Sequence, residues 1–147
     1  MTSVRPLALF ATLVIAAPTL AACASEGSSG SASGAGAITV QNCGEDVTVD
    51  GPVTELYAYD GGIISIVLAA GARDELVAVT GMARDQDLLE LAYPDDRVDE
   101  LTVVGDEFPT LENVLAVDPQ VMFAGYGYGF SEARNLLPEM LTEHDIT

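Results

Sequence analysis

The chain has 147 residues, a length that suits one α/β domain better than two large ones. It carries 23 acidic residues against five arginines and no lysine, for a formal net charge of -18. Proteins that track nucleic acid or adhere to anionic lipid depend on Lys and Arg, so the composition argues against both classes, while acidity by itself identifies no partner.

The first 22 residues are typical of a secretory signal peptide. Arg5 gives a positive start, residues 7–17 are almost entirely apolar, and two alanines precede Cys23. The LAAC motif that ends at Cys23 resembles the bacterial lipobox, in which cleavage leaves a cysteine that carries diacylglycerol. We therefore expect lipidation at Cys23 and a chain anchored at the extracytoplasmic face of the cell membrane. The alternative is a transmembrane anchor, because residues 6–25 carry no charge.

Residues 23–37 are expected to form a tether between the anchor and the folded domain. Residues 26–36, EGSSGSASGAG, have little apolar surface to bury and predict a flexible coil. The folded domain is predicted over residues 38–147. Its one cysteine, Cys43, is either buried and inert or paired with another thiol, and we favour the buried state because free cysteine is usually buried.

The folded domain opens with a predicted β-hairpin and continues as alternating strands and helices. β-Branched runs at residues 38–40 and 47–49 flank Asn42-Cys43-Gly44, in which Asn and Gly are typical turn residues. Strands are then predicted at residues 56–59, 76–79, 101–104 and 121–124, and helices at residues 63–70, 86–91, 111–117 and 132–141. The last two residues, Ile146 and Thr147, look like the start of another strand. This alternation predicts an α/β fold with a mainly parallel sheet and right-handed crossovers.

Several residues predict where helices begin and end. Gly71 is the expected C-cap of the first helix. Thr110 is expected to cap the third helix, with Glu112 in its first turn, and Pro119 forbids its continuation. Ser131 is the expected cap of the fourth helix.

The strand at residues 121–124 is apolar on both faces, as expected for a central parallel strand that helices cover on both sides. It leads into a loop, residues 125–129, in which glycine alternates with tyrosine. Open α/β sheets bind ligands at the carboxyl ends of their strands. Small or polar residues follow all four predicted strands, at Asp60-Gly61-Gly62, Thr80-Gly81, Gly105-Asp106 and Gly125–Gly129.

No catalytic pattern accompanies these loops. The alternating glycines of residues 125–129 lack a lysine, and the tyrosines between them would crowd a pyrophosphate. The single histidine, His144, argues against a zinc or manganese site built by the protein and is expected to be solvated at a helix end. Cys43 has no candidate base beside it in sequence, and Ser131 is better explained as a cap than as a nucleophile. We therefore predict a binding protein without a built-in cofactor, not an enzyme.

The candidate ligand contacts are aromatic and charged residues near the strand ends. A tyrosine offers a rigid apolar face and one hydroxyl group, which suits a large ligand, although ordinary rim aromatics would show the same pattern. Arg84 and Arg134 would meet carboxylate or carbonyl oxygens of a ligand, or pair with nearby acids. The predicted ligand-binding residues are Tyr59, Asp60, Arg84, Tyr126 and Tyr128.

Four features together resemble the class III substrate-binding proteins of ABC importers, the lipoproteins that bind ferric siderophores, cobalamin or haem. They are the lipobox with its tether, the hairpin, the segment VTELYAYDGGIISIVLAAGARDELVAVTG and the segment PTLENVLAVDPQVMFAG, which is the most specific. The likeness spans residues 38–147. It implies two α/β lobes joined by one long helix, with the ligand between them. The sequence corresponds to the N-terminal lobe and ends at Thr147 after the fourth strand–helix unit, so the linking helix and the second lobe are expected to be missing from it.

The resemblance implies capture of a ferric siderophore and its delivery to an ABC permease. The iron would arrive inside the ligand, so the protein needs no metal-binding residues of its own. In this family each lobe carries an exposed acid that pairs with arginines of the permease, and the matching residue is Glu112; an acid favoured by the helix dipole explains the same position. Cobalamin or haem is the first alternative ligand. A sensor or interaction lipoprotein without a transport role is the alternative from another class.

Overall fold

The computed structural model describes residues 36–125 and 128–147; the predicted signal peptide, the lipidation site Cys23 and Tyr126 lie outside these ranges. In chain order the elements are β1 (Ile38–Asn42), β2 (Glu45–Val49), β3 (Leu56–Tyr59), α1 (Gly61–Ala69), β4 (Leu76–Thr80), α2 (Gln86–Ala92), the 3₁₀ helix η1 (Val98–Glu100), β5 (Val103–Gly105), α3 (Leu111–Val117), β6 (Val121–Ala124), the 3₁₀ helix η2 (Glu132–Arg134) and α4 (Pro138–Thr142). Among the helices of these two ranges, none combines the length and the apolarity needed to cross a bilayer.

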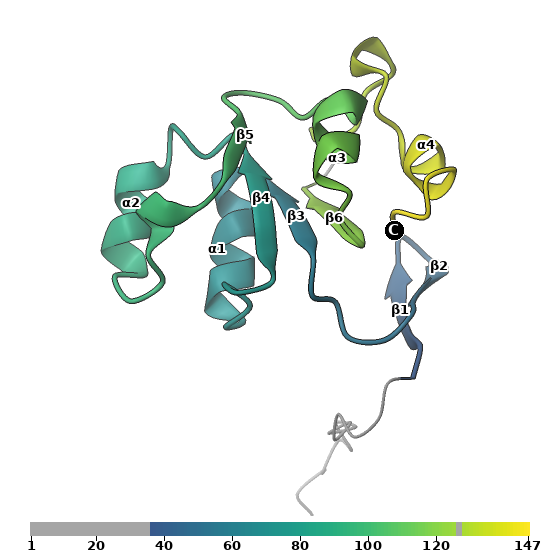
Figure 1. Ribbon diagram of the computed structural model, residues 1–147, viewed down its shortest axis with the longest axis horizontal. Helices are drawn as coiled ribbons and strands as arrows, with labels where there is room; N and C mark the ends of the chain where they lie inside the picture. Colours follow the sequence, from purple (N-terminus) through teal and green to yellow (C-terminus); the bar gives the residue numbers. More distant parts are fainter. Residues whose placement is uncertain (1–35, 126–127) are drawn as a thin grey trace, which may run out of the picture. The chain divides into compact units, whose positions relative to one another are not determined.

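A four-stranded parallel sheet forms the centre of the fold, with strand order β5-β4-β3-β6. From β3 the chain proceeds to β4 and β5 in one direction, and then returns to place β6 on the other side of β3 (Figure 1). Helices α1 and α2 pack with one hydrophobic cluster, and α3 and α4 contribute to a second. The predicted α/β fold with a mainly parallel sheet is confirmed.

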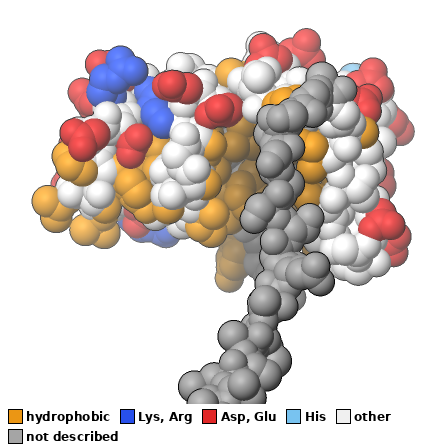
Figure 2. All heavy atoms as spheres, turned by 90° about the horizontal axis from the view of Figure 1, so that it is seen from below, with side chains coloured by type: hydrophobic (Ala, Val, Ile, Leu, Met, Phe, Trp, Pro, Cys, Tyr) orange, Lys and Arg blue, Asp and Glu red, His pale blue; other side chains and the backbone are white. Residues whose placement is uncertain are grey.

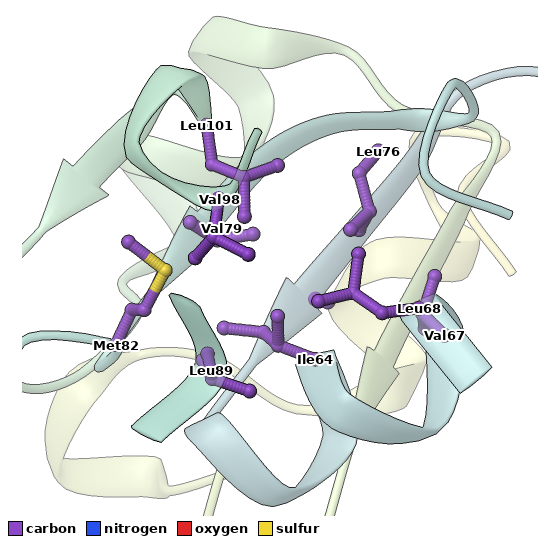
Figure 3. Packing of buried hydrophobic residues seen from close by; sticks show 10 residues of the cluster. Ile64, Val67, Leu68, Leu76, Val79, Met82, Leu89, Val98 and Leu101 are labelled. Atoms are coloured by element: carbon purple, nitrogen blue, oxygen red, sulfur yellow. The ribbon is translucent and has the colours of Figure 1, made fainter. Parts of the chain in front are cut away.

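The first cluster lies between the sheet and helices α1 and α2. Ile64 of α1, Val79 of β4 and Leu89 of α2 converge in it (Figure 3), and all three are buried. The two helices approach closely because Gly61 has no side chain: a Cβ atom there would lie 2.6 Å from the Cβ of Asp85, the residue before α2. The absence of a side chain at Gly61 therefore allows the start of α1 to lie next to the start of α2.

The second cluster contains a buried polar pair. Tyr57 of β3 and Thr80 of β4 are completely buried, and their hydroxyl groups hydrogen-bond each other. Met122 of β6, Val114 of α3 and Leu141 of α4 lie in the same cluster. This pair joins two neighbouring strands by a side-chain contact inside the core.

Because the Tyr57 phenol is buried, we expect the folded protein to lose stability at alkaline pH. Burial raises the pKa of its phenol above 10.0, and the hydrogen bond with Thr80 opposes this by a smaller amount. Because the folded pKa exceeds the unfolded pKa, the stabilising contribution is fully present below pH about 10 and is lost as the pH rises through the folded pKa. In urea unfolding at pH 8 and above pH 10, Tyr57→Phe should be less stable at pH 8, by about 1–3 kcal/mol for the unpaired Thr80 hydroxyl, and should lose less on alkalinisation. An equal alkaline loss in both proteins would contradict the assignment to Tyr57.

β6 agrees only in part with the central, doubly covered strand that its sequence predicted. It lies at the end of the four-strand order, and the side chain of Phe123 is 39% exposed. The predicted strand start at the last two residues is supported, because the N–H of Met122 donates to the carbonyl of Thr147 (2.8 Å) and the N–H of Thr147 donates to the carbonyl of Gln120 (3.1 Å). β6 is therefore hydrogen-bonded on both sides, and the exposure of Phe123 is where it departs from the prediction.

The hairpin β1–β2 is antiparallel as predicted, but its turn differs. Asn42 pairs with Glu45 within the ladder, so the turn residues are Cys43 and Gly44, with φ angles of 53° and 88°. Two successive positive φ angles are typical of the tight turns that join strands of a twisted hairpin. The expectation that Cys43 is buried is wrong, because this position at the turn exposes it.

The helix predicted at residues 132–141 is interrupted. Only residues 132–134 and 138–142 are helical, and Asn135 between them has the left-handed φ of 50°. Pro138 begins α4 because its ring and missing N–H exclude it from a helix interior. Ser131 makes no capping hydrogen bond, in contrast to the prediction. His144 is exposed just after α4, as predicted.

Candidate functional site

The strand order places the candidate site at the carboxyl ends of β3 and β6. These two parallel strands are neighbours, with Tyr59 opposite Ala124. After β3 the chain enters α1 on one face of the sheet, whereas the segment after β6 leads to α4, which packs with the cluster of the other face. Neighbouring strands whose connections diverge in this way form the ligand-binding crevice of open α/β sheets.

Asp60 follows β3 and has an unusual backbone. Its φ of 80° and ψ of 139° lie in a region that residues other than glycine rarely adopt. Its carboxylate accepts from the N–H of Gly62 (2.9 Å) and so caps α1. The same carboxylate lies 3.6 Å from the Arg84 guanidinium. Two interactions therefore hold this strained residue at the strand end.

Arg84 follows β4, and its side chain is 79% exposed. It pairs with Asp85 at 3.4 Å as well as with Asp60. The hydrogen bond with Asp85 raises the pKa of Arg84, and the charges of Asp85 and Asp60 add to this effect. Of the two roles expected from sequence, pairing with nearby acids is the one present in the structure; contact with a ligand stays a prediction.

Tyr59 lies at the strand end as predicted, but its side chain is only 4% exposed. Two glycines allow the neighbouring loops to close over its ring. A Cβ atom at Gly81 would lie 2.9 Å from the ring and 3.0 Å from the carbonyl of Glu107, and one at Gly129 would lie 3.2 Å from the ring and 2.4 Å from the Cβ of Ala124. Burial, followed by the charge of Asp60, raises the pKa of Tyr59. The ring thus supports the loops around it.

The exposed aromatic residues of the edge come from two other loops. Tyr128, after β6, is 74% exposed, and Phe108, between β5 and α3, is 44% exposed. The Phe108 ring lies 6.2 Å from the Tyr59 ring, measured between centroids. Arg134 places its guanidinium carbon 4.5 Å from the centre of the Phe108 ring and donates from Nη2 to the carbonyl of Tyr128 (2.7 Å).

Sequence reasoning missed Phe108, and it named Arg134 only as a companion of Arg84. The available signal for Phe108 was its place in the loop after the third predicted strand, beside Pro109. Asp60, Arg84 and Asp85 come together, and so do Phe108, Arg134 and the backbone of Tyr128. Within residues 36–125 and 128–147, no three His, Cys, Asp or Glu side chains are grouped closely enough to hold a metal ion.

Hollows in the described part of the chain lie elsewhere. One of about 880 Å³ is bordered by the β1–β2 hairpin, β6 and the C-terminal segment. Another of about 290 Å³ lies between α1 and α2, where Gly62, Leu88 and Tyr93 line it. Figure 2 shows the molecule from below, with hydrophobic side chains from the lower left of that face to its middle and acidic groups at its upper left and on its right. Neither hollow is lined by Arg84, Phe108 or Tyr128, and we call these exposed residues near the strand ends the wall.

Comparison with known proteins relates this lobe to binding proteins through its fold. No protein-family model and no curated relative matches the chain. It is similar to a periplasmic binding protein from Veillonella parvula, with a TM-score of 0.57 and 16% identity over 76% of this chain and 36% of that one. It is also similar to an ABC-type Fe3+-hydroxamate transport system from Saccharomonospora viridis, with a TM-score of 0.52 and 22% identity over 75% of this chain and 37% of that one. The fold is that of one lobe of a periplasmic binding protein, and the chain spans little more than a third of either neighbour.

Proposed function

We propose that the chain is the ligand-binding lobe of an extracytoplasmic lipoprotein, anchored through Cys23, that captures a ferric siderophore and delivers it to an ABC permease. The observation that carries this proposal is the exposed wall at the carboxyl ends of β3 and β6, in a lobe whose fold is shared with periplasmic binding proteins. One similar structure belongs to a Fe3+-hydroxamate transport system, which favours this ligand class.

The chemistry of the wall suits a ligand that brings its own metal-binding groups. Tyr128 and Phe108 offer exposed aromatic surface to a bulky ligand. Arg84 and Asp60 offer a charged donor and a charged acceptor beside it. We assign Tyr126 to the same wall from its place in the sequence. Tyr59 would contribute indirectly, because its buried ring packs against the loops that carry the ligand contacts.

A fluorescence titration of the full-length protein tests the proposal. The sequence has five tyrosines and no tryptophan, so tyrosine emission is the intrinsic signal. Titration with a ferric trihydroxamate or a ferric tricatecholate should quench it saturably, and Tyr128→Ala should weaken the response. No response to either complex would discard the siderophore assignment. A shifted Soret band on mixing with haem would instead favour the haem alternative, because tyrosine can ligate haem iron.

Glu112 is the proposed contact with the permease. It is exposed in the first turn of α3, which Thr110 caps by accepting from the N–H of Asn113 (3.2 Å). Glu112→Ala should leave ligand affinity unchanged and reduce ligand uptake by about tenfold, the effect of losing about 1.4 kcal/mol of docking free energy.

Asp87 provides a matched control for Glu112. It is also exposed in the first turn of a helix, α2, so Asp87→Ala removes the same favourable interaction with a helix dipole. Uptake assays should show a loss for Glu112→Ala only. An equal loss for both variants would assign the effect to helix stability or total charge and would remove the docking role.

A further inference from the structure

Arg134 connects the loops that follow two different strands, β5 and β6. Its guanidinium covers the Phe108 ring at 4.5 Å, and its Nη2 donates to the carbonyl of Tyr128 at 2.7 Å. The Phe108 ring in turn neighbours Tyr59 at the end of β3. The segments after β5 and β6 therefore meet around the Arg134 side chain, and Phe108 connects them to the end of β3.

The turn that carries Arg134 closes without its guanidinium. The N–H of Ser131 donates to the carbonyl of Leu136 (2.7 Å), and the N–H of Leu136 donates to the carbonyl of Ser131 (3.1 Å). The side chain of Leu136 is completely buried and anchors this turn in the core. The guanidinium contacts with Phe108 and Tyr128 thus join this turn to other segments and are not needed to form it.

Arginine is suited to both contacts at once. Its planar guanidinium can stack on an aromatic ring while its edge donates hydrogen bonds, whereas lysine has a single point charge and no plane. The Nε of Arg134 is buried and has no hydrogen-bond partner among the residues that the structure describes. Within the described residues, the Arg134 contacts are therefore the stack on Phe108 and the bond to the Tyr128 carbonyl.

We propose that Arg134 is a positioning residue that fixes the loop after β6 to the loop after β5, so that Tyr128 and Phe108 form one wall. We call the three partners, Arg134, Phe108 and the Tyr128 carbonyl, the Arg134 clamp. The effect of the clamp on ligand affinity rests on the proposed function, but the clamp itself joins the two loops without any ligand.

The clamp can be tested on the ligand-free, full-length protein. Arg134→Gln should speed amide hydrogen exchange at residues 128–130 by about tenfold, whereas the exchange of Leu136 should be unchanged. Arg97→Gln is the matched control, because it also removes one positive charge and breaks the exposed ion pair of Arg97 with Glu100. Arg97 lies before the amino end of β5, away from the loops that follow the strands. Unchanged exchange at residues 128–130 in Arg134→Gln would overturn the clamp.

Arg134→Lys separates charge from geometry. The charge of Arg134 lowers the pKa of Tyr59, against burial and Asp60, which raise it. Tyr59 should therefore titrate at higher pH in Arg134→Gln and near its original pH in Arg134→Lys, as followed by NMR of its ring. Exchange at residues 128–130 should stay fast in Arg134→Lys. Full protection of these amides by lysine would show that a positive charge suffices and would overturn the stacking role.

Affinity then tests the link to function. For whichever ferric trihydroxamate or tricatecholate binds the parent protein, Arg134→Gln should weaken binding about tenfold. Phe108→Leu should weaken it too, and the double variant should lose little more than either single variant, because the two residues act as a unit. Binding by the parent with no loss in Arg134→Gln would overturn the positioning role. If neither complex binds the parent, the proposed function fails, and the exchange experiment still decides whether the clamp exists.

Discussion

Gly81→Ala should destabilise the protein by about 2–5 kcal/mol, an unusually large effect for the addition of one methyl group. Gly81 has a φ of 72°, so any L-side chain there pays a backbone cost. The new Cβ would also lie 2.9 Å from the Tyr59 ring and 3.0 Å from the backbone oxygen of Glu107. Because the oxygen belongs to the main chain, relief requires the backbone at Glu107 to shift as well as the Tyr59 ring, and the loops that pack on the ring would move with them. Urea unfolding measures the cost.

Gly71→Ala is the matched control. Gly71 has nearly the same φ, 76°, but a Cβ atom there meets nothing within 4 Å. It should therefore cost only the backbone term, about 1–2 kcal/mol. Equal losses at the two glycines would show that Tyr59 and Glu107 do not crowd Gly81, which would contradict the close packing beneath the candidate site.

Tyr59→Ala should cost about 3–5 kcal/mol of unfolding free energy, whereas Tyr128→Ala should change it by no more than about 0.5 kcal/mol. The Tyr59 side chain is buried among Gly81, Gly129 and Phe108, so its removal leaves a cavity under three loops. Tyr128 exposes most of its surface and loses little packing. Urea unfolding of both variants, together with the ligand titration, separates the structural role of Tyr59 from the proposed ligand contact of Tyr128.

The expected pattern is that Tyr128→Ala stays folded and weakens binding. Tyr59→Phe, which keeps the ring, should retain both stability and affinity. If Tyr128→Ala bound the ferric complex as tightly as the parent protein, Tyr128 would not be part of the wall. A small stability loss in Tyr59→Ala would show that the ring does not hold the loops together.

Elements with strong local signals could be predicted to within one or two residues. The strand at Leu56–Tyr59 and the start of α3 at Leu111 agree with the structure, and Thr110 makes the predicted capping bond. The helix after residue 131 could not be predicted from its apolar residues, because Pro138 and the left-handed Asn135 divide it. The position of β6 in the sheet depends on a crossover, which no local pattern encodes.

The sequence could place the candidate residues at one edge of the sheet, but not their exposure. Tyr59 ends one apolar strand and Tyr128 follows another, yet Tyr59 is buried and Tyr128 is exposed. This difference depends on Gly81, Gly129 and Phe108, which come from other loops. Likewise, the pairing of Arg84 with Asp60 requires β3 and β4 to be neighbours. Tyr126 and the lipidation site Cys23 lie outside the described residues, so their roles stay predictions.

The sheet order also has a consequence for folding kinetics. At the start of β3, the N–H of Glu55 donates to the side chain of Gln120, a residue 65 positions later. Contacts between residues so distant in sequence carry a high loop-closure entropy and are slow to form. The pairing of β3 with β6 therefore carries the largest loop-closure entropy in this sheet, and its carboxyl end lies at the proposed wall. A ligand that contacted the ends of both strands would bridge them and oppose their separation.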